Sequence, residues 1–255
     1  MTPEYIRPDT PVPATFTAKS TASVPNIDPE WWRVFSNRTL NDLIAEANVD
    51  NTDTAAAVHR IEQARASYRI ARSSLFPFIE ASAEAALTYT NARNAPARTE
   101  TTLSAGASLD YDLDLFGGNR AETEAARADL ASRQFDHGMI ELTVQAEVAA
   151  TYTALLLARE RQRISAYTIR NFEEILRVAE ARFEAGATTT LDVSRQKSEL
   201  AAARASRAVL LEDIRNAENA LAVLLGDAAG TLKISGSGLA SLKAPKIMPG
   251  QPAAL

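Results

Sequence analysis

Two stretches near the middle of the chain alternate apolar and polar residues. In residues 79–90 the odd positions carry Ile, Ala, Leu and Tyr, while the even positions carry Glu, Ser, Thr and one Ala. In residues 102–115 the odd positions carry Leu, Ala and Tyr, and the even positions carry Thr, Ser, Gly and Asp. A period of two is typical of a β-strand with one apolar and one polar face. The pattern therefore predicts a β-hairpin over residues 77–117, with strands at about 78–90 and 101–116. One face of this hairpin would be apolar and the other polar.

The segment before this hairpin has the period of an α-helix. Apolar residues recur there every three or four positions, which predicts a helix over residues 38–76. Pro77 ends it, because the residue before a proline is pushed out of the helical region. A polar patch, "NVDNTD", is a possible interruption near Asn51. The first 37 residues are rich in proline and predict an extended arm.

The segment after the hairpin predicts a long helical hairpin over residues 118–226. Its first helix, 119–185, would be about 100 Å long at the usual rise per residue. The turn near 186–191 carries Gly186, which suits the left-handed position after a helix, and a capping-box pattern from Thr189 to Asp192. A rod of this length suits a structure that crosses a wide compartment. Residues 227–255 have a loop-like composition.

Composition and charge exclude several function classes. The absence of cysteine rules out disulfides, thiol catalysis and Cys-based metal sites. A net charge of -5 and the lack of a basic stripe argue against nucleic acid as a partner. His59 and His137 lack ligand partners at metal-site spacing, and Glu173 and Glu174 lie on a predicted solvated helix face. We therefore expect no catalytic, cofactor-binding or metal-binding residues, and no enzyme activity.

The alternation leaves two interpretations of the hairpin open. It could cover a soluble core with its apolar face. Alternatively it could supply barrel strands to a membrane, with the alanine-rich face and its tyrosines (Tyr89, Tyr111) toward lipid and the acidic face toward water. In the second case, strands from elsewhere must close the sheet edges, because unpaired backbone groups are not tolerated in hydrocarbon. The periodicity alone does not separate these interpretations.

Four blocks of the sequence resemble a known family. They are "WWRVFSNRTLNDLIAEA", "ARSSLFPFIEASAE", "LDYDLDLFGGNRAETEAARADL" and "RFEAGATTTLDVSRQKSELAAARA". In this order they are similar to the outer-membrane efflux proteins, the TolC-like outer-membrane factors, over almost the whole chain. The resemblance implies a mainly α fold with one β-hairpin. Long antiparallel coiled-coil-like helices would be joined to two transmembrane β-barrel strands, which together make half of a TolC-like protomer.

The same resemblance implies a function. Family members are trimeric passive conduits that lie in the cell outer membrane and extend into the periplasm. They work with a periplasmic adaptor protein and an inner-membrane transporter, and their barrel contacts outer-membrane lipid. The implied periplasmic tip and adaptor-docking residues are Gly186, Thr190, Leu191, Asp192 and Val193. The implied lumen-facing residues are Glu80, Glu84, Asp110, Asp112 and Asp114. Phe116 would then mark the membrane interface.

Two features depart from the family pattern. Lipid-anchored members begin with an acylated cysteine just before an arm like Tyr5 to Pro8, whereas Met1 stands near that place here. The export signal and the lipid-anchor cysteine are therefore expected to be absent from this chain. Only one of the family's two repeats is present, so we expect that these 255 residues alone are not a working channel. The alternative function is a soluble periplasmic coiled-coil scaffold or adaptor-like protein.

Overall fold

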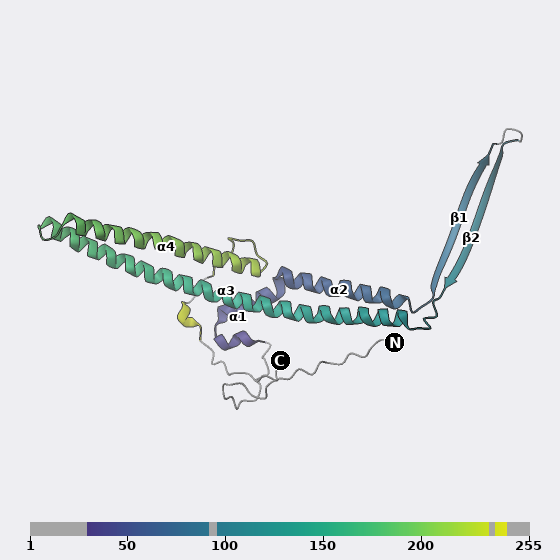
Figure 1. Cartoon of the computed structure of the whole chain (residues 1–255), viewed down its shortest axis with the longest axis horizontal. Helices are drawn as coiled ribbons and strands as arrows, with labels where there is room; N and C mark the ends of the chain where they lie inside the picture. Colours follow the sequence, from purple (N-terminus) through teal and green to yellow (C-terminus); the bar gives the residue numbers. More distant parts are fainter. Residues whose placement is uncertain (1–29, 92–95, 235–237, 244–255) are drawn as a thin grey trace, which may run out of the picture. The chain divides into compact units, whose positions relative to one another are not determined.

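A computed structural model of the chain describes residues 30–91, 96–234 and 238–243 (Figure 1). Within these residues it has long α-helices and one two-stranded antiparallel sheet, which confirms the predicted fold class. In chain order the elements are η1 (Trp31–Phe35), α1 (Arg38–Asp50), α2 (Thr52–Ser73), β1 (Phe78–Thr90), β2 (Arg98–Asp110), α3 (Gly118–Glu184), α4 (Thr190–Leu224) and η2 (Leu239–Ser241). Among the described residues, every helix is too short or too polar to pass through a bilayer.

The described chain divides into two compact units. The first comprises the described residues of 57–136 and contains the β-hairpin. The second comprises residues 30–56 together with the described residues of 137–243. The division passes through α2 and α3, each of which continues from one unit into the other.

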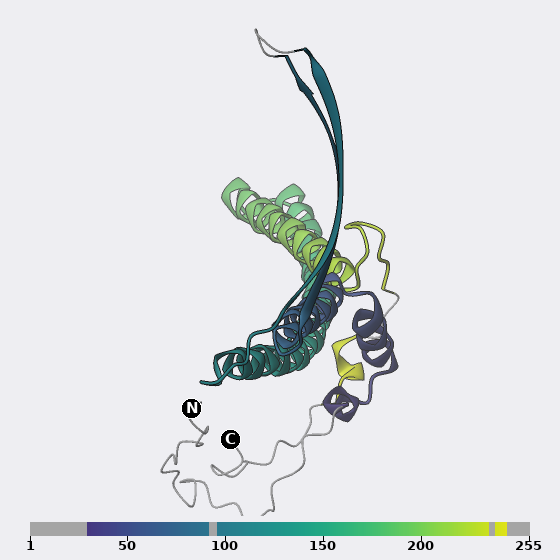
Figure 2. The ribbon, with the colours of Figure 1, turned by 90° about the vertical axis from the view of Figure 1, so that its right-hand side faces the viewer.

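The β-hairpin of the first unit is regular and has two different faces. β1 and β2 pair antiparallel from Phe78 opposite Asp110 to Thr90 opposite Arg98, as the long ribbon in Figure 2 shows. In this register every even-numbered residue lies opposite an even-numbered one, and every odd-numbered residue opposite an odd-numbered one. Because paired residues project to the same side of a sheet, the polar positions of both strands share one face. The apolar positions share the other.

The apolar face of the hairpin is exposed in the part of the chain that the structure describes. Leu103 is 81% exposed and Leu87 is 71% exposed, and their neighbours on the face are exposed as well. A half-buried hairpin over a soluble core would have hidden these side chains. The structure thus places an unpartnered apolar surface on β1 and β2.

The second strand ends earlier than the alternation predicts. β2 stops at Asp110, so the prediction of a strand to residue 116 is wrong. Asp114 has a left-handed backbone, with φ of 36°, and Gly117 follows with φ of 78°. Asp110 is already the last residue with a partner in β1, and these dihedral angles then turn the chain out of the extended conformation before α3. The predicted interruption of the helix near Asn51 is confirmed, whereas the helix ends at Ser73 rather than at residue 76.

The second unit contains the main apolar core. Its elements meet around the middle of α3, where Tyr152 is fully buried. The largest buried residues are Leu40 and Ile44 of α1, Val148, Tyr152, Leu155 and Leu156 of α3, Leu221 of α4, and Leu225. Buried Asn37 caps α1 by accepting a hydrogen bond from the Leu40 backbone at 2.9 Å, and its amide donates to Ser241 Oγ at 3.0 Å. This core fixes α1, α3 and the end of α4 together.

Away from this core, α3 and α4 run side by side as an antiparallel pair with little burial (Figures 1 and 2). Ion pairs join the two helices, from Arg204 to Glu173 at 2.7 Å and from Lys197 to Glu180 at 3.1 Å. Such exposed pairs contribute little stability individually. The predicted capping box and the glycine turn between the two helices are both present.

Candidate functional site

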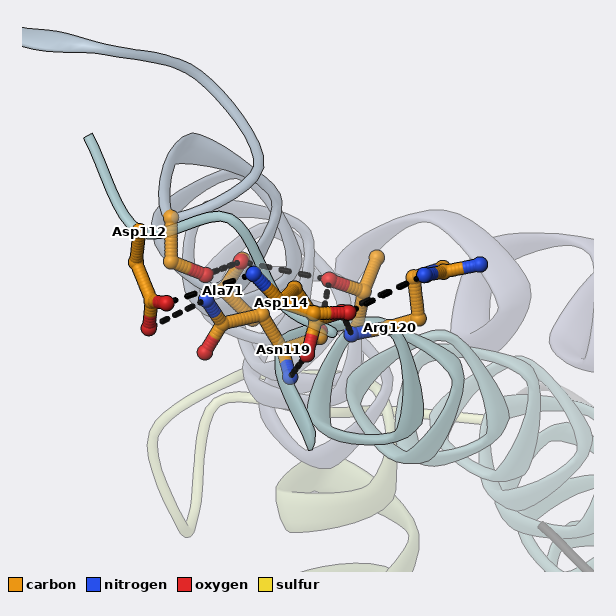
Figure 3. A network of polar contacts seen from close by, with 7 residues as sticks. Ala71, Asp112, Asp114, Asn119 and Arg120 are labelled. Carbon is orange, nitrogen blue, oxygen red and sulfur yellow. Dashed lines mark hydrogen bonds and ion pairs between the residues drawn. The ribbon is translucent and has the colours of Figure 1, made fainter. Parts of the chain in front are cut away.

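Two polar constellations define candidate sites, and the first is the corner between β2 and α3. Asp114 lies there with its carboxylate directed at the start of α3 (Figure 3). Its Oδ1 accepts from the Asn119 backbone N–H at 3.1 Å, and its Oδ2 accepts from the Arg120 backbone N–H at 3.0 Å. The first amides of a helix have no partner within it, and a negative charge is favourable at that end. Asp114 therefore stabilises the beginning of a 67-residue helix.

Further contacts tie this corner to its surroundings. The Arg120 guanidinium donates to Asp114 Oδ2 at 3.3 Å and to the Asp114 carbonyl at 3.1 Å. Asp112 accepts from the Asp114 backbone N–H and from the Asn119 side-chain amide, each at 3.2 Å (Figure 3). Thr123 Oγ1 donates to carbonyls of Asn119 and of Ala71 in α2, at 2.8 and 3.2 Å. The corner thus holds α2 and α3 together where the hairpin leaves them.

The corner also shifts the pKa of the Asp114 carboxyl. Partial desolvation raises this pKa. Hydrogen bonds from the Arg120 and Asn119 backbone amides and from the Arg120 guanidinium together lower it by more than desolvation raises it. The net result is a pKa below the ordinary value for aspartate. Asp114 is therefore ionised at neutral pH, as its capping role requires.

This geometry changes the expected role of two aspartates. The family resemblance implies that Asp112 and Asp114 lie on the polar strand face together with Asp110, but they lie beyond the end of β2. Their carboxylates face the α3 amides and Asn119 instead. The physical reason is that β1 begins at Phe78, the partner of Asp110, so residues beyond Asp110 have no strand to pair with and the free amides of α3 are the donors within reach. The sequence signal was the Gly-Gly pair of "FGGNR", which marks a helix start as well as a turn.

The other predicted face residues do share one face. Glu80 lies opposite Ser108, Glu84 opposite Ser104, and Asp110 opposite Phe78. The charged residues of β1 and β2 are all even-numbered, and four of the five are acidic: Glu80, Glu84, Glu100 and Asp110 against Arg98. We call the face formed by the even-numbered residues of β1 and β2 the even face, and the face formed by the odd-numbered residues the odd face. The even face is polar and acidic, and the odd face carries no charge.

The second constellation is the turn between α3 and α4. Gly186 has φ of 73°, and the Ala187 N–H donates to the Arg182 carbonyl at 2.8 Å, which ends α3. Thr189 begins α4 through a reciprocal capping box with Asp192. The Thr189 hydroxyl accepts from the Asp192 N–H at 3.3 Å, and Asp192 accepts from the Thr189 N–H at 3.2 Å. The hydrogen bonds that end α3 and begin α4 thus join residues of the turn to one another.

The predicted tip residues take different positions in this turn. Thr190 is the first residue of α4, Leu191 is 68% exposed, and Val193 is buried between the helices. The hydroxyls of Thr189 and Thr188 and the Thr189 N–H lower the pKa of the Asp192 carboxyl, and Arg195 adds to the effect. A shallow groove of about 340 Å³ follows the turn, lined by Ile175, Val178, Arg182, Thr188, Asp192 and other residues of α3 and α4. Leu191 is thus the tip residue that offers apolar surface to solvent.

Comparison with known proteins identifies the family. The model of the family described as outer membrane efflux protein matches residues 43–227, which is more than half of the chain. The chain belongs to the outer membrane efflux protein family. The segment matched includes the hairpin, the corner and the tip.

Individual relatives agree with this assignment. The pyoverdine export outer membrane protein OpmQ of Pseudomonas aeruginosa is 32% identical over 234 residues, covering 89% of this chain and 49% of OpmQ. The cation efflux system protein CusC of Escherichia coli K12 is 26% identical over 230 residues, covering 89% of this chain and 50% of CusC. The chain thus spans about half the length of these relatives.

Solved structures show the same fold. The outer-membrane channel OprN matches with a TM-score of 0.80 at 27% identity, covering 98% of this chain and 56% of OprN. A crystal structure of CusC matches with a TM-score of 0.78 at 25% identity, covering 99% of this chain and 57% of that one. The structure is therefore half of a TolC-like protomer with its long helices.

Proposed function

We propose that this chain is part of a subunit of an outer-membrane channel in a tripartite efflux or export system. In this function it is a passive conduit across the outer membrane and the periplasm. The two strands belong to a membrane barrel, and α3 and α4 form part of a periplasmic helical tunnel. Membership of the outer membrane efflux protein family supports this proposal.

The observation that carries the proposal is the separation of faces on the hairpin. The odd face has exposed Ile, Leu and Tyr residues and no charge, and the even face has four acidic residues. An exposed apolar surface of this kind requires a partner, and lipid is the partner of barrel strands with this alternation. The even face then lines the aqueous lumen, with Glu80, Glu84 and Asp110 along it.

The partners follow from the same proposal. A trimer closes the barrel in the full-length family, and the tip around Gly186 docks a periplasmic adaptor that links the channel to an inner-membrane transporter. The exposed Leu191 side chain and the groove beside Asp192 support the docking role of the tip. The exported compound depends on the pump that delivers it.

Cell fractionation and conductance test the proposal together. A chain that carries both repeats of the family is expected in the outer-membrane fraction and should give stable unitary conductance in a planar bilayer after extraction in detergent, whereas these 255 residues alone should give none. A two-repeat chain that stays as a monomer in the soluble periplasmic fraction and gives no conductance would contradict the proposal. That result would favour the coiled-coil scaffold.

A further inference from the structure

Asn51 is a buried polar residue at the meeting point of three helix ends. It lies between α1 and α2 and is only 3% exposed. Its backbone N–H donates to the Ala47 carbonyl at 3.1 Å in the last turn of α1, and its carbonyl accepts from the Ala55 N–H at 3.1 Å in the first turn of α2. The backbone of one residue therefore ends one helix and begins the next.

The side-chain amide of Asn51 both accepts and donates hydrogen bonds. Oδ1 accepts from the backbone N–H groups of Asp53 at 2.9 Å and Thr54 at 3.1 Å, which caps α2. Nδ2 donates at 2.8 Å to the carbonyl of Leu224, the last residue of α4 and 173 positions away in sequence. The final carbonyls of a helix have no N–H donor inside it, so this bond satisfies one of them. An acceptor-only or donor-only side chain cannot do both.

The backbone around this contact is packed closely. Gly226, which follows α4, has φ of 80°, and a Cβ built on it would lie 2.3 Å from the Asp50 carbonyl oxygen. The Asp227 N–H donates back to the Ala222 carbonyl at 2.8 Å, which closes the end of α4. The ends of α1 and α4 therefore touch through backbone, and Asn51 bridges them with its side chain.

The two ends of α4 differ in how they are held. The tip end has an exposed capping box and exposed ion pairs, whereas Leu221, Ala222 and Leu225 at the other end are buried to 2% exposure or less. We propose that Asn51 is the positioning residue that anchors α4, and that its amide N–H to Leu224 is the bond that holds this end in register. This role requires at position 51 a neutral side chain that donates a hydrogen bond to α4 and also accepts hydrogen bonds from α2.

Hydrogen–deuterium exchange of the protein in detergent tests the proposal with Asn51→Asp. The carboxylate keeps the cap on α2 but cannot donate to Leu224 at neutral pH. Amides 225–227 should then exchange roughly tenfold faster than in the parent, which corresponds to about 1.4 kcal/mol. Amides 53–55 of α2 and 187–193 of the tip should be unchanged. Asn51→Ala should accelerate exchange at both 53–55 and 225–227.

Lowering the pH separates the bond from general destabilisation. A protonated aspartic acid can donate to Leu224 and still accept from α2, so the difference between Asn51→Asp and the parent should vanish near pH 4, each compared at the same pH. Asn48→Asp is the matched control. The Asn48 side chain accepts a hydrogen bond from Gln145 at 3.2 Å through Oδ1, and a carboxylate at this position can still accept it. This variant should leave residues 225–227 unchanged at both pH values. Normal exchange at 225–227 in Asn51→Asp at pH 7, no recovery at low pH, or an equal effect of Asn48→Asp would each overturn the proposal.

Discussion

The two units use the same amino acids in opposite ways. Leu155 and Leu40 of the second unit are 0% and 1% exposed, whereas Leu103 and Leu109 of the hairpin are 81% and 63% exposed. The core of the second unit gains its stability from contacts within the chain. The hairpin has regular strand pairing, but its apolar side chains on the odd face are exposed. We propose that lipid covers these exposed apolar residues.

The first prediction compares one substitution in both environments. Leu155→Ala should lower the free energy of unfolding of the helical unit by about 2–5 kcal/mol, because it removes fully buried methyl groups and leaves a cavity. Leu103→Ala should leave the same transition unchanged. Chemical denaturation followed by circular dichroism at 222 nm measures both. Similar losses for the two variants would contradict the contrast between the units.

The second prediction introduces a charge on each hairpin face. In the full-length context, Leu109→Arg places a cation on the odd face one residue from the end of β2, and it should reduce membrane assembly at a cost below the roughly 2–4 kcal/mol of a charge at mid-bilayer. Ser108→Arg places it on the even face opposite Glu80, where it should be tolerated. The amount of protein assembled in the outer membrane is the measurement. Equal assembly of both variants would refute the assignment of faces.

The third prediction concerns the corner and its pH dependence. The folded-state pKa of Asp114 is lowered, so its contribution to stability is present above the ordinary aspartate pKa of about 3.9 and is lost as the pH falls through the lower folded value. Asp114→Asn should thus lower the melting temperature at pH 6, and the difference from the parent should shrink toward pH 2.

Asp110→Asn is the control for this measurement, because Asp110 ends β2 and makes none of the α3 capping bonds. A difference between Asp114→Asn and the parent that stays constant from pH 6 to pH 2 would show that the carboxylate charge is not what caps α3.

The fourth prediction is the smallest in its effect on folding. Leu191→Arg and Asp192→Arg at the tip should leave the helical circular dichroism little changed, since both side chains are exposed and loss of the Asp192 half of the capping box affects only the first turn of α4. They should weaken crosslinking to the adaptor or leave the channel leaky to antibiotics. Parental crosslinking and parental antibiotic exclusion in both variants would mean that the tip is only a turn.

The features that could be predicted are those encoded within a few residues. The alternation gave the hairpin and its faces, and the "TTLD" pattern gave the capping box at Thr189. The end of β2 was missed because Asp112 and Asp114 continue the alternation in sequence while their carboxylates bind the start of α3. The role of Asn51 was missed for another reason. Its polar patch marked a break, but nothing local points to a carbonyl 173 residues away.

Thiol labelling tests the central claim most directly. The chain has no cysteine, so Leu103→Cys on the odd face and Ser104→Cys on the even face each provide a single reporter. In outer membranes, a membrane-impermeant maleimide should label the thiol at 104, which faces water. The thiol at 103 should react only after denaturation in detergent, although Leu103 is 81% exposed in the structure. Equal labelling of both thiols in intact membranes would contradict the claim that lipid covers the odd face of the hairpin.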